Sequence, residues 1–241
     1  MRLVIVTLVC VVGLLVGIGC ESCPLVKCAD CEQIGVWKPL FDGKSIEGWK
    51  VAGGTATFKV EEGCIVGTTK EGSPNSFLVP PGFYDNFELS FEVKVDDDLN
   101  SGVQIRSHIT DKDQEMGGDA KKKRVRPKGT VYGYQVEIAT NGNAGRVWDE
   151  ARHTQWHEPD PSDTQKALFK KGQWNQYHVV AQGDHIRVWL NGKPTSDFHD
   201  KEDASGILGF QVHGIKPGSG PYHVRWKNIQ IRNLAADTKV N

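Results

Sequence analysis

The sequence lacks an excess of charge of either sign. Its 29 Lys and Arg residues are balanced by 30 Asp and Glu residues, for a formal net charge of −1. Such a chain lacks the excess of basic residues that is typical of nucleic-acid-binding proteins. Long apolar runs are missing beyond residue 18, and no segment keeps a helical period over a useful length. These absences argue against a nucleic-acid-binding protein and against a helical bundle.

The one long apolar run, residues 3–18, stands at the very N-terminus behind Arg2. It is short for a membrane span and is typical of an export signal. The small residues before Cys20 resemble a lipoprotein cleavage site, although Gly17 stands where leucine is usual. We therefore expect a signal peptide at 1–19, a lipid on Cys20 that anchors the chain to a membrane, and a location in the periplasm or cell envelope. Ordinary signal cleavage and an uncleaved anchor remain alternatives.

Cysteines concentrate in the segment that follows, a tether at 20–36. Cys20, Cys23, Cys28 and Cys31 have C-x2-C-x4-C-x2-C spacing, which is compatible with a zinc knuckle. Export favours disulfides instead. If Cys20 carries lipid, the other three and Cys64 leave an even number, enough for two disulfides of open connectivity. Cys64 is equally compatible with a small buried hydrophobe in a strand.

From Trp37 onward the chain consists of short β-type segments separated by turns. Residues 87–95 alternate apolar and polar side chains, and Asn191-Gly192 is a tight-turn signal. Many short strands with glycine-rich turns predict an all-β sandwich or barrel. We expect one such domain at 37–234 and a C-terminal tail at 235–241. The stretch 141–171 looks like a long irregular loop, and it contains Trp148 and Arg152.

Three segments, residues 100–106, 133–139 and 209–214, place polar groups at every second position. Because successive side chains of a strand point to opposite faces, their apolar residues can share one buried face. The other face would then carry Gln104, Arg106, Gln135, Glu137, Gln211 and His213. Planar groups with several hydrogen-bonding atoms suit a polyhydroxylated ligand. The pattern therefore points to a sugar-facing sheet. The alternative interpretations are structural: a cross-strand salt bridge between Glu137 and Arg106, and a His213 that only hydrogen-bonds a neighbour.

The segments also resemble, in order, the bacterial 3-keto-disaccharide hydrolase family. The matching pieces are LFDGKSIEGW, FELSFEVKV with NSGVQIR, GYQVEI, GQWNQYHVVAQGDHIRVWLNG, and GILGFQVHG with VRWKNIQIRNL. They cover roughly residues 37–234, and Lys227 departs from the arginine that the family often has there. The resemblance implies a jelly roll of two antiparallel sheets similar to the concanavalin A-like lectins and glucanases, with the ligand on the concave face.

The resemblance also implies cleavage of 3-keto-glycosides at the glycosidic bond, by elimination and hydration or by hydrolysis. Such a route needs a base near C2, donors near the C3 oxygen and an acid for the leaving oxygen. We assign catalysis to Glu137 or His213 as the base and to Arg106 at the oxyanion. The expected substrate contacts are Asn100, Gln104, Gln135, Gln211, Trp148 and Arg152.

Two other functions compete. A two-carboxylate glycosidase would pair Glu137 with Asp149 or Glu150 from the loop, but an E-x-D-x-E strand is absent. A non-catalytic carbohydrate-binding module would use the same face, with stacking on Trp148 or Trp156. In each case the partner is a carbohydrate. No spacing on this face requires a metal, and we expect no cofactor.

Overall fold

The computed structural model describes residues 34–116 and 124–236. The expected signal peptide, Cys20 and most of the Cys-rich tether lie outside the described residues, as does most of the expected tail. Cys64 is described and carries a free, partly buried thiol at the start of its strand. No helix within 34–116 and 124–236 has the length and apolarity needed to cross a membrane.

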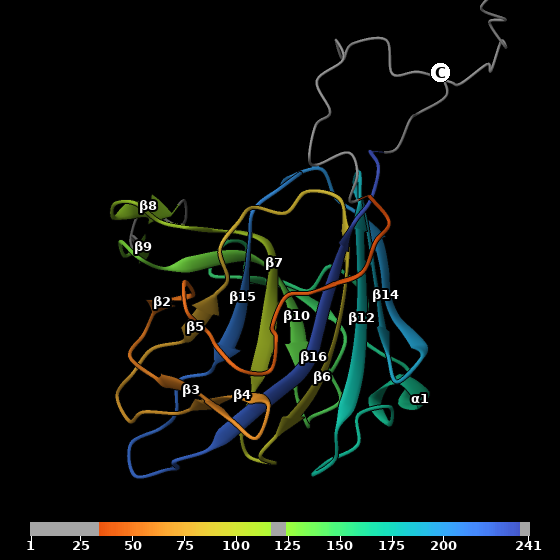
Figure 1. Cartoon of the computed structure of the whole chain (residues 1–241). Helices are drawn as coiled ribbons and strands as arrows, with labels where there is room; N and C mark the ends of the chain where they lie inside the picture. Colours follow the sequence, from red (N-terminus) through yellow and green to blue (C-terminus); the bar gives the residue numbers. More distant parts are fainter. Residues whose placement is uncertain (1–33, 117–123, 237–241) are drawn as a thin grey trace, which may run out of the picture. The chain divides into compact units, whose positions relative to one another are not determined.

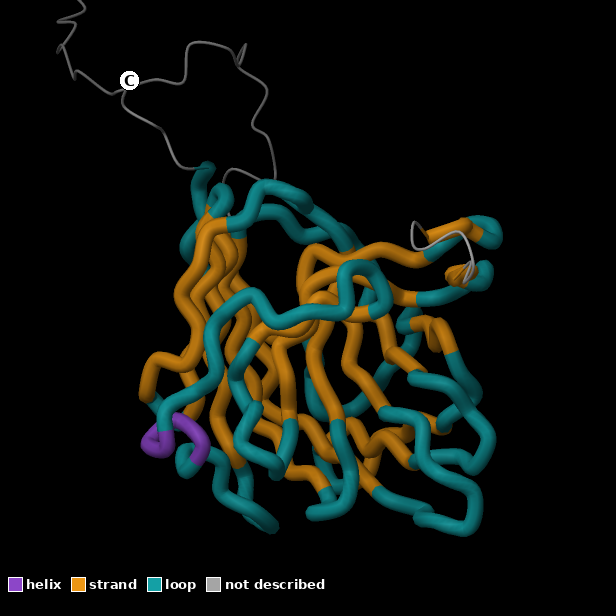
Figure 2. The backbone as a smooth tube through the Cα atoms, turned by 180° about the vertical axis from the view of Figure 1, so that it is seen from behind, coloured by secondary structure: helices purple, strands orange, loops and turns teal. Residues whose placement is uncertain are grey.

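Two antiparallel sheets form the body of the domain, and loops join the strands at both ends (Figures 1 and 2). The larger sheet has the spatial order β14 (Lys193–His199), β13 (His185–Leu190), β12 (Asn175–Gln182), β6 (Phe87–Val95), β16 (His223–Asn233), β4 (Cys64–Thr68) and β3 (Thr57–Glu61), with β1 (Lys38–Pro39) also paired to β16. The prediction of an all-β antiparallel sandwich is confirmed.

The smaller sheet has six strands and carries the three segments singled out in the sequence. Its order is β11 (Val147–Glu150), β10 (Val131–Ile138), β7 (Ser101–Ile109), β15 (Ile207–Val212), β5 (Ser76–Val79) and β2 (Lys50–Gly53). A separate hairpin pairs β8 (Gln114–Met116) with β9 (Arg124–Arg126), and the short helix α1 spans Asp163–Lys166. The segments with polar alternation are therefore neighbours: β10, β7 and β15 lie side by side.

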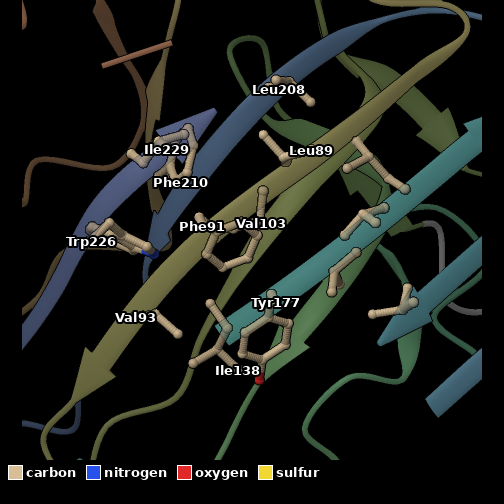
Figure 3. Packing of buried hydrophobic residues seen from close by; sticks show 14 of the residues in the cluster. Leu89, Phe91, Val93, Val103, Ile138, Tyr177, Leu208, Phe210, Trp226 and Ile229 are labelled. Atoms are coloured by element: carbon tan, nitrogen blue, oxygen red, sulfur yellow. The ribbon is translucent and has the colours of Figure 1, made fainter. Parts of the chain in front are cut away.

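Alternation builds the core between the two sheets. In β6 the residues of one face are buried and those of the other are partly exposed, because every second side chain points toward the smaller sheet. The core side chains of both sheets meet there: Phe91 of β6 packs edge to face against Phe210 of β15 at 6.3 Å between ring centroids (Figure 3). Trp226 from β16 is fully buried in the same cluster.

The prediction of a long irregular loop at 141–171 is wrong in part. Residues 147–150 form β11, which pairs with β10 at the edge of the smaller sheet. Four residues are too few for an alternation pattern to stand out, since periodicity needs a longer window. The strand places Trp148 beside Gln135 and Glu150 beside Gly133.

Candidate functional site

Three glutamines from adjacent strands meet on the outer face of the smaller sheet. In register, Gln104 of β7 lies opposite Gln135 of β10 and opposite Gly209 of β15. The Gln135 carbonyl oxygen accepts hydrogen bonds from Gln104 Nε2 at 2.9 Å and from Gln211 Nε2 at 2.8 Å. All three side chains are buried. Gln104 and Gln211 therefore orient Gln135 from beneath the surface.

The glutamine cluster orients Glu137. Gln135 Nε2 donates to Glu137 Oε2 at 3.0 Å, and Asn100 Nδ2 donates to Glu137 Oε1. Gly102 leaves room for this arrangement, since an added Cβ would lie 2.6 Å from the Gln135 side chain. The Glu137 side chain is thus held by the amides of Gln135 and Asn100, and the Gln135 amide is itself fixed by Gln104 and Gln211.

Burial makes the Glu137 carboxyl a weaker acid than an ordinary glutamate. It is only 6 % exposed, and the loss of hydration raises its pKa from 4.5 to about 7, although the hydrogen bonds from Gln135 and Asn100 act in the opposite direction. The Glu150 carboxylate adds a smaller upward push. A carboxyl group with this pKa exchanges protons near neutrality, which is the property of an efficient general acid or base.

A cavity of about 220 Å³ opens over Glu137. Its walls are Asn100, Gln135, Glu137, Trp148, Glu150, Trp156 and His213. The rings of Trp148 and Trp156 meet edge to face at 4.9 Å, and the Arg146 guanidinium lies 4.1 Å from the Trp156 ring. Aromatic faces beside planar hydrogen-bonding groups are the chemistry that accommodates a sugar ring. Since drug-sized pockets measure roughly 300–1,000 Å³, this volume suits a single ring.

Glu150 and His213 stand together at one side of this cavity. Asn75 joins them, because its Nδ2 donates to Glu150 Oε1 at 3.0 Å and its Oδ1 accepts from the backbone N–H of Gly214 at 3.0 Å. Burial raises the pKa of Glu150, whereas Asn75 and His213 lower it. His213 Nδ1 lies 2.6 Å from the Gly214 carbonyl oxygen, which only accepts. Nδ1 therefore carries a proton, and Nε2 is the ring nitrogen left for other partners.

A second cavity, of about 520 Å³, shares two of its wall residues with the first. It is lined by Gly53, Pro74, Asn75, Phe77, Pro127, Lys128, Gly129, Thr130, Val131, Glu150 and His213. Glu150 and His213 line both cavities, whereas Glu137 lines only the smaller one. The site thus has two chambers with a carboxyl and an imidazole at their junction.

The prediction that Arg106 shares this polar face is wrong. Strand β7 bulges here: between its paired positions Gln104 and Ser107 it has two residues where β15 has one, and Arg106 has a φ of +45°. The bulge turns the side chain toward loops of the larger sheet, where Nε donates to the Asp85 carbonyl and an Nη to the Gly183 carbonyl, each at 2.7 Å. The fully buried guanidinium ties the sheets together and contacts neither cavity, so it is not available to an oxyanion.

Arg152 also lies apart from both cavities. Its Nε donates to the buried Asp149 carboxylate at 2.9 Å, and Nη1 donates to Asp203. Asp149, His153 and Glu202 bring three ligand atoms within 4.8 Å of one another. A metal there would face the Arg152 guanidinium, which already neutralises Asp149, so this group has the character of an ion-pair network.

The expected residues Asn100, Gln135, Glu137, Trp148 and His213 line the smaller cavity, and Gln104 and Gln211 support it. Asn75 is not among the expected site residues, and the sequence suggests Trp156 only for the binding-module alternative and Glu150 only for the glycosidase alternative. Glu150 shares a strand face with Trp148 two positions away, which is the one sequence signal that favours it. Asn75 lies in the irregular segment directly before β5, and no local sequence pattern marks it as a site residue.

A family model described as 3-keto-alpha-glucoside-1,2-lyase-like domain matches residues 36–232, in agreement with the resemblance drawn from the sequence. No curated protein matches the chain. A "putative glycosyl hydrolase" from Parabacteroides distasonis superposes with a TM-score of 0.55 at 21% identity, over 88% of this chain and 99% of that one. A galectin-like protein of unknown function from Bacillus subtilis gives 0.51 at 10% identity, over 85% and 97%. Carbohydrate-binding module CBM66 from the same species gives 0.50 at 13%, over 77% and 96%. These likenesses support the fold, the predicted lectin-type jelly roll.

Proposed function

The chain belongs to the 3-keto-alpha-glucoside-1,2-lyase-like domain family, and on that premise we propose that it cleaves 3-keto-glycosides by elimination across C1 and C2. The observation that carries the proposal is Glu137: a buried carboxyl with a pKa of about 7, in a cavity the size of a sugar ring with indole walls. A binding surface has no need of such a costly group, whereas proton transfer does.

The proposed reaction begins at C2 of the sugar. The ketone at C3 acidifies the C2 hydrogen, and a base removes it as a proton. The electrons of the C–H bond form the C2–C3 double bond of an enolate, with negative charge on the C3 oxygen. When the ketone re-forms, the electrons move to a C1–C2 double bond and the C1–O bond breaks. The leaving oxygen takes a proton, so that an unsaturated ketone and a free alcohol result.

Glu137 is our choice for the base. It lines only the chamber that fits the sugar ring, and a base with a pKa of about 7 is unprotonated in a useful fraction of molecules at neutral pH while keeping strength for the transfer. The amides of Asn100 and Gln135 that hold Glu137 offer further N–H groups to the C3 oxygen. These two amides replace Arg106 in the role that the sequence assigned to it.

Glu150 is our choice for the proton donor. It stands at the junction of the chambers, where the glycosidic oxygen lies if the ring occupies the smaller one. Its raised pKa keeps a larger share of the carboxyl protonated near neutrality than an exposed glutamate would have. His213, whose Nδ1 is used on the Gly214 carbonyl, positions a sugar hydroxyl beside it through Nε2.

The test uses a 3-keto-α-glucoside deuterated at C2. We expect release of the alcohol together with an unsaturated ketone, a primary isotope effect on kcat/KM, and a loss of about 10²–10⁴-fold for Glu137→Gln, the usual range for a general base. Lys227→Gln, on the other sheet, is the control and keeps full activity. Binding of the glycoside without any product would refute the enzyme and leave a carbohydrate-binding module.

One observation favours a second candidate, a two-carboxylate glycosidase: Glu137 and Glu150 line the same cavity. Such an enzyme cleaves an ordinary glycoside, needs no ketone and shows no primary isotope effect at C2. Turnover of the unoxidised glucoside at a rate similar to that of the 3-keto compound would select this candidate over elimination.

Export and a lipid on Cys20 are part of the proposal. They are supported by the apolar run at residues 3–18 and the small residues before Cys20. Mass spectrometry of the mature N-terminus tests them: a lipidated residue 20 is expected, and an unmodified chain that begins at Met1 would contradict both.

A further inference from the structure

The two chambers differ in the chemistry of their walls. Five of the seven residues around the smaller chamber carry amide, carboxyl or imidazole groups. The larger chamber instead has Phe77, Val131, Pro74 and Pro127 among its walls, with glycine backbone at two further positions. Phe77 and Val131 also belong to a small apolar cluster of their own on this face of the sheet. The larger chamber is therefore prepared for a ligand of different character from the sugar ring.

The polar side chains of the larger chamber are largely occupied. Asn75 uses its amide on Glu150 and on the backbone of Gly214. The Thr130 hydroxyl donates to the Pro127 carbonyl at 2.7 Å. Lys128 is exposed at the rim. A second sugar placed here would bring several hydroxyls out of water with few partners, which is unfavourable.

We propose that the larger chamber is a subsite for the leaving group and selects an apolar aglycone, such as one with an aromatic ring, over a second sugar. The inference rests on the proposed function, because it places the ring over Glu137 and the scissile oxygen at Glu150. From that junction the leaving group has to extend into the larger chamber, against Phe77 and Val131. Binding energy gained there, remote from the reacting bond, raises kcat/KM.

Three substrates test the inference: the methyl and 2-phenylethyl 3-keto-α-glucosides and a 3-keto-disaccharide with the same anomeric configuration. Methanol and 2-phenylethanol are alcohols of similar acidity, so their glycosides differ mainly in what enters the larger chamber. We expect kcat/KM for the 2-phenylethyl compound to exceed both others by about tenfold or more, the scale of small apolar contacts in a pocket. A disaccharide turned over as well as the 2-phenylethyl compound would overturn the inference.

Val131→Thr supplies the matched variant, since it exchanges a methyl group of the chamber wall for a hydroxyl of similar shape. It should lower kcat/KM for the 2-phenylethyl compound by about tenfold and leave the methyl compound unchanged. Val51→Thr, the same exchange at an exposed position of β2 outside both cavities, should change neither. Equal losses for both substrates in Val131→Thr would contradict the subsite.

The outcomes also separate this inference from the proposal on which it rests. Turnover of the methyl compound with no preference for the 2-phenylethyl compound rejects the subsite and keeps the lyase. No turnover of any 3-keto-glucoside by the wild type rejects the lyase, and the subsite with it. If Val131→Thr does not fold, as judged by its circular dichroism spectrum, the substrate ranking of the wild type decides.

Discussion

The buried carboxyl of Glu137 predicts a specific dependence of stability on pH. The pKa of a glutamate is ordinarily 4.5, and that of Glu137 is about 7 in the folded domain, so the folded state holds the proton more tightly than the unfolded chain. The free energy of unfolding is then highest below pH 4.5 and falls as pH rises through 7, because the folded state must ionise a buried group. Between pH 5 and pH 8 the loss amounts to about 2–3 kcal/mol.

Glu137→Gln removes this ionisation. The variant has its own constant penalty, because the amide that replaces the carboxylate offers one acceptor oxygen where Asn100 and Gln135 both donate. That penalty is the same at both pH values and cancels when each protein is compared with itself. We therefore expect the stability of the wild type to fall by about 2–3 kcal/mol more than that of the variant between pH 5 and pH 8, a relative shift in Tm of about 5–10 °C for a domain of this size.

Urea unfolding at the two pH values, followed by tryptophan fluorescence, measures both free energies. Glu47→Gln is the matched control, because Glu47 is an exposed glutamate and its loss should leave the pH dependence of the wild type intact. Parallel pH profiles for wild type and Glu137→Gln would refute the reasoning, since they would mean that Glu137 ionises as easily in the fold as in the unfolded chain.

Three further predictions concern single side chains. Arg106→Met leaves the Asp85 and Gly183 carbonyls without their donor and should destabilise the domain by about 3–5 kcal/mol in urea unfolding, while the folded fraction keeps its KM; a raised KM would show that Arg106 reaches the substrate after all. Trp148→Ala removes one indole wall of the smaller cavity and should raise KM for the 3-keto-glucoside by about tenfold with the Tm little changed, an effect of roughly 1.4 kcal/mol; an unchanged KM would contradict stacking. Asn75→Ala removes the hydrogen bond that lowers the pKa of Glu150, so the alkaline limb of the pH–rate profile should move to higher pH if Glu150 is the acid, and a shift to lower pH would contradict that role.

The period-two pattern predicts the sheet and much of the site, because burial of one face fixes which side chains point outward. Gln104, Gln135 and Gln211 follow this rule, and their strands are neighbours in the sheet. Glu137 follows it on the same strand as Gln135. The pattern succeeds wherever the strand is regular and long enough for its two faces to be distinguished.

The same pattern fails where the backbone departs from regularity. Arg106 occupies the correct position in the sequence, but a β-bulge reverses its side chain, and no alternation rule anticipates a single residue at positive φ. Trp148 and Glu150 lie on an edge strand of four residues, which is too short to be recognised. Asn75 reaches Glu150 across 75 positions in the sequence. Because β10, β7 and β15 lie between the strands β5 and β11, neither sequence proximity nor strand pairing anticipates this contact.

The outer face of the smaller sheet buries polar side chains, whereas its inner face is apolar. Buried side chains are usually apolar, yet three glutamines and a glutamate are buried here on the backs of strands whose other faces build the core. Hydrogen bonds among the glutamines offset part of the cost of burying them, although Gln211 Oε1 has no partner among the described residues. Glu137 reduces the stability of the fold once it ionises. A network that fixes one costly carboxyl at the floor of a cavity contributes less to stability than apolar packing would. Its value lies in the orientation and acidity of that carboxyl, and this is the reason to look for proton transfer at Glu137 before any other place in the domain.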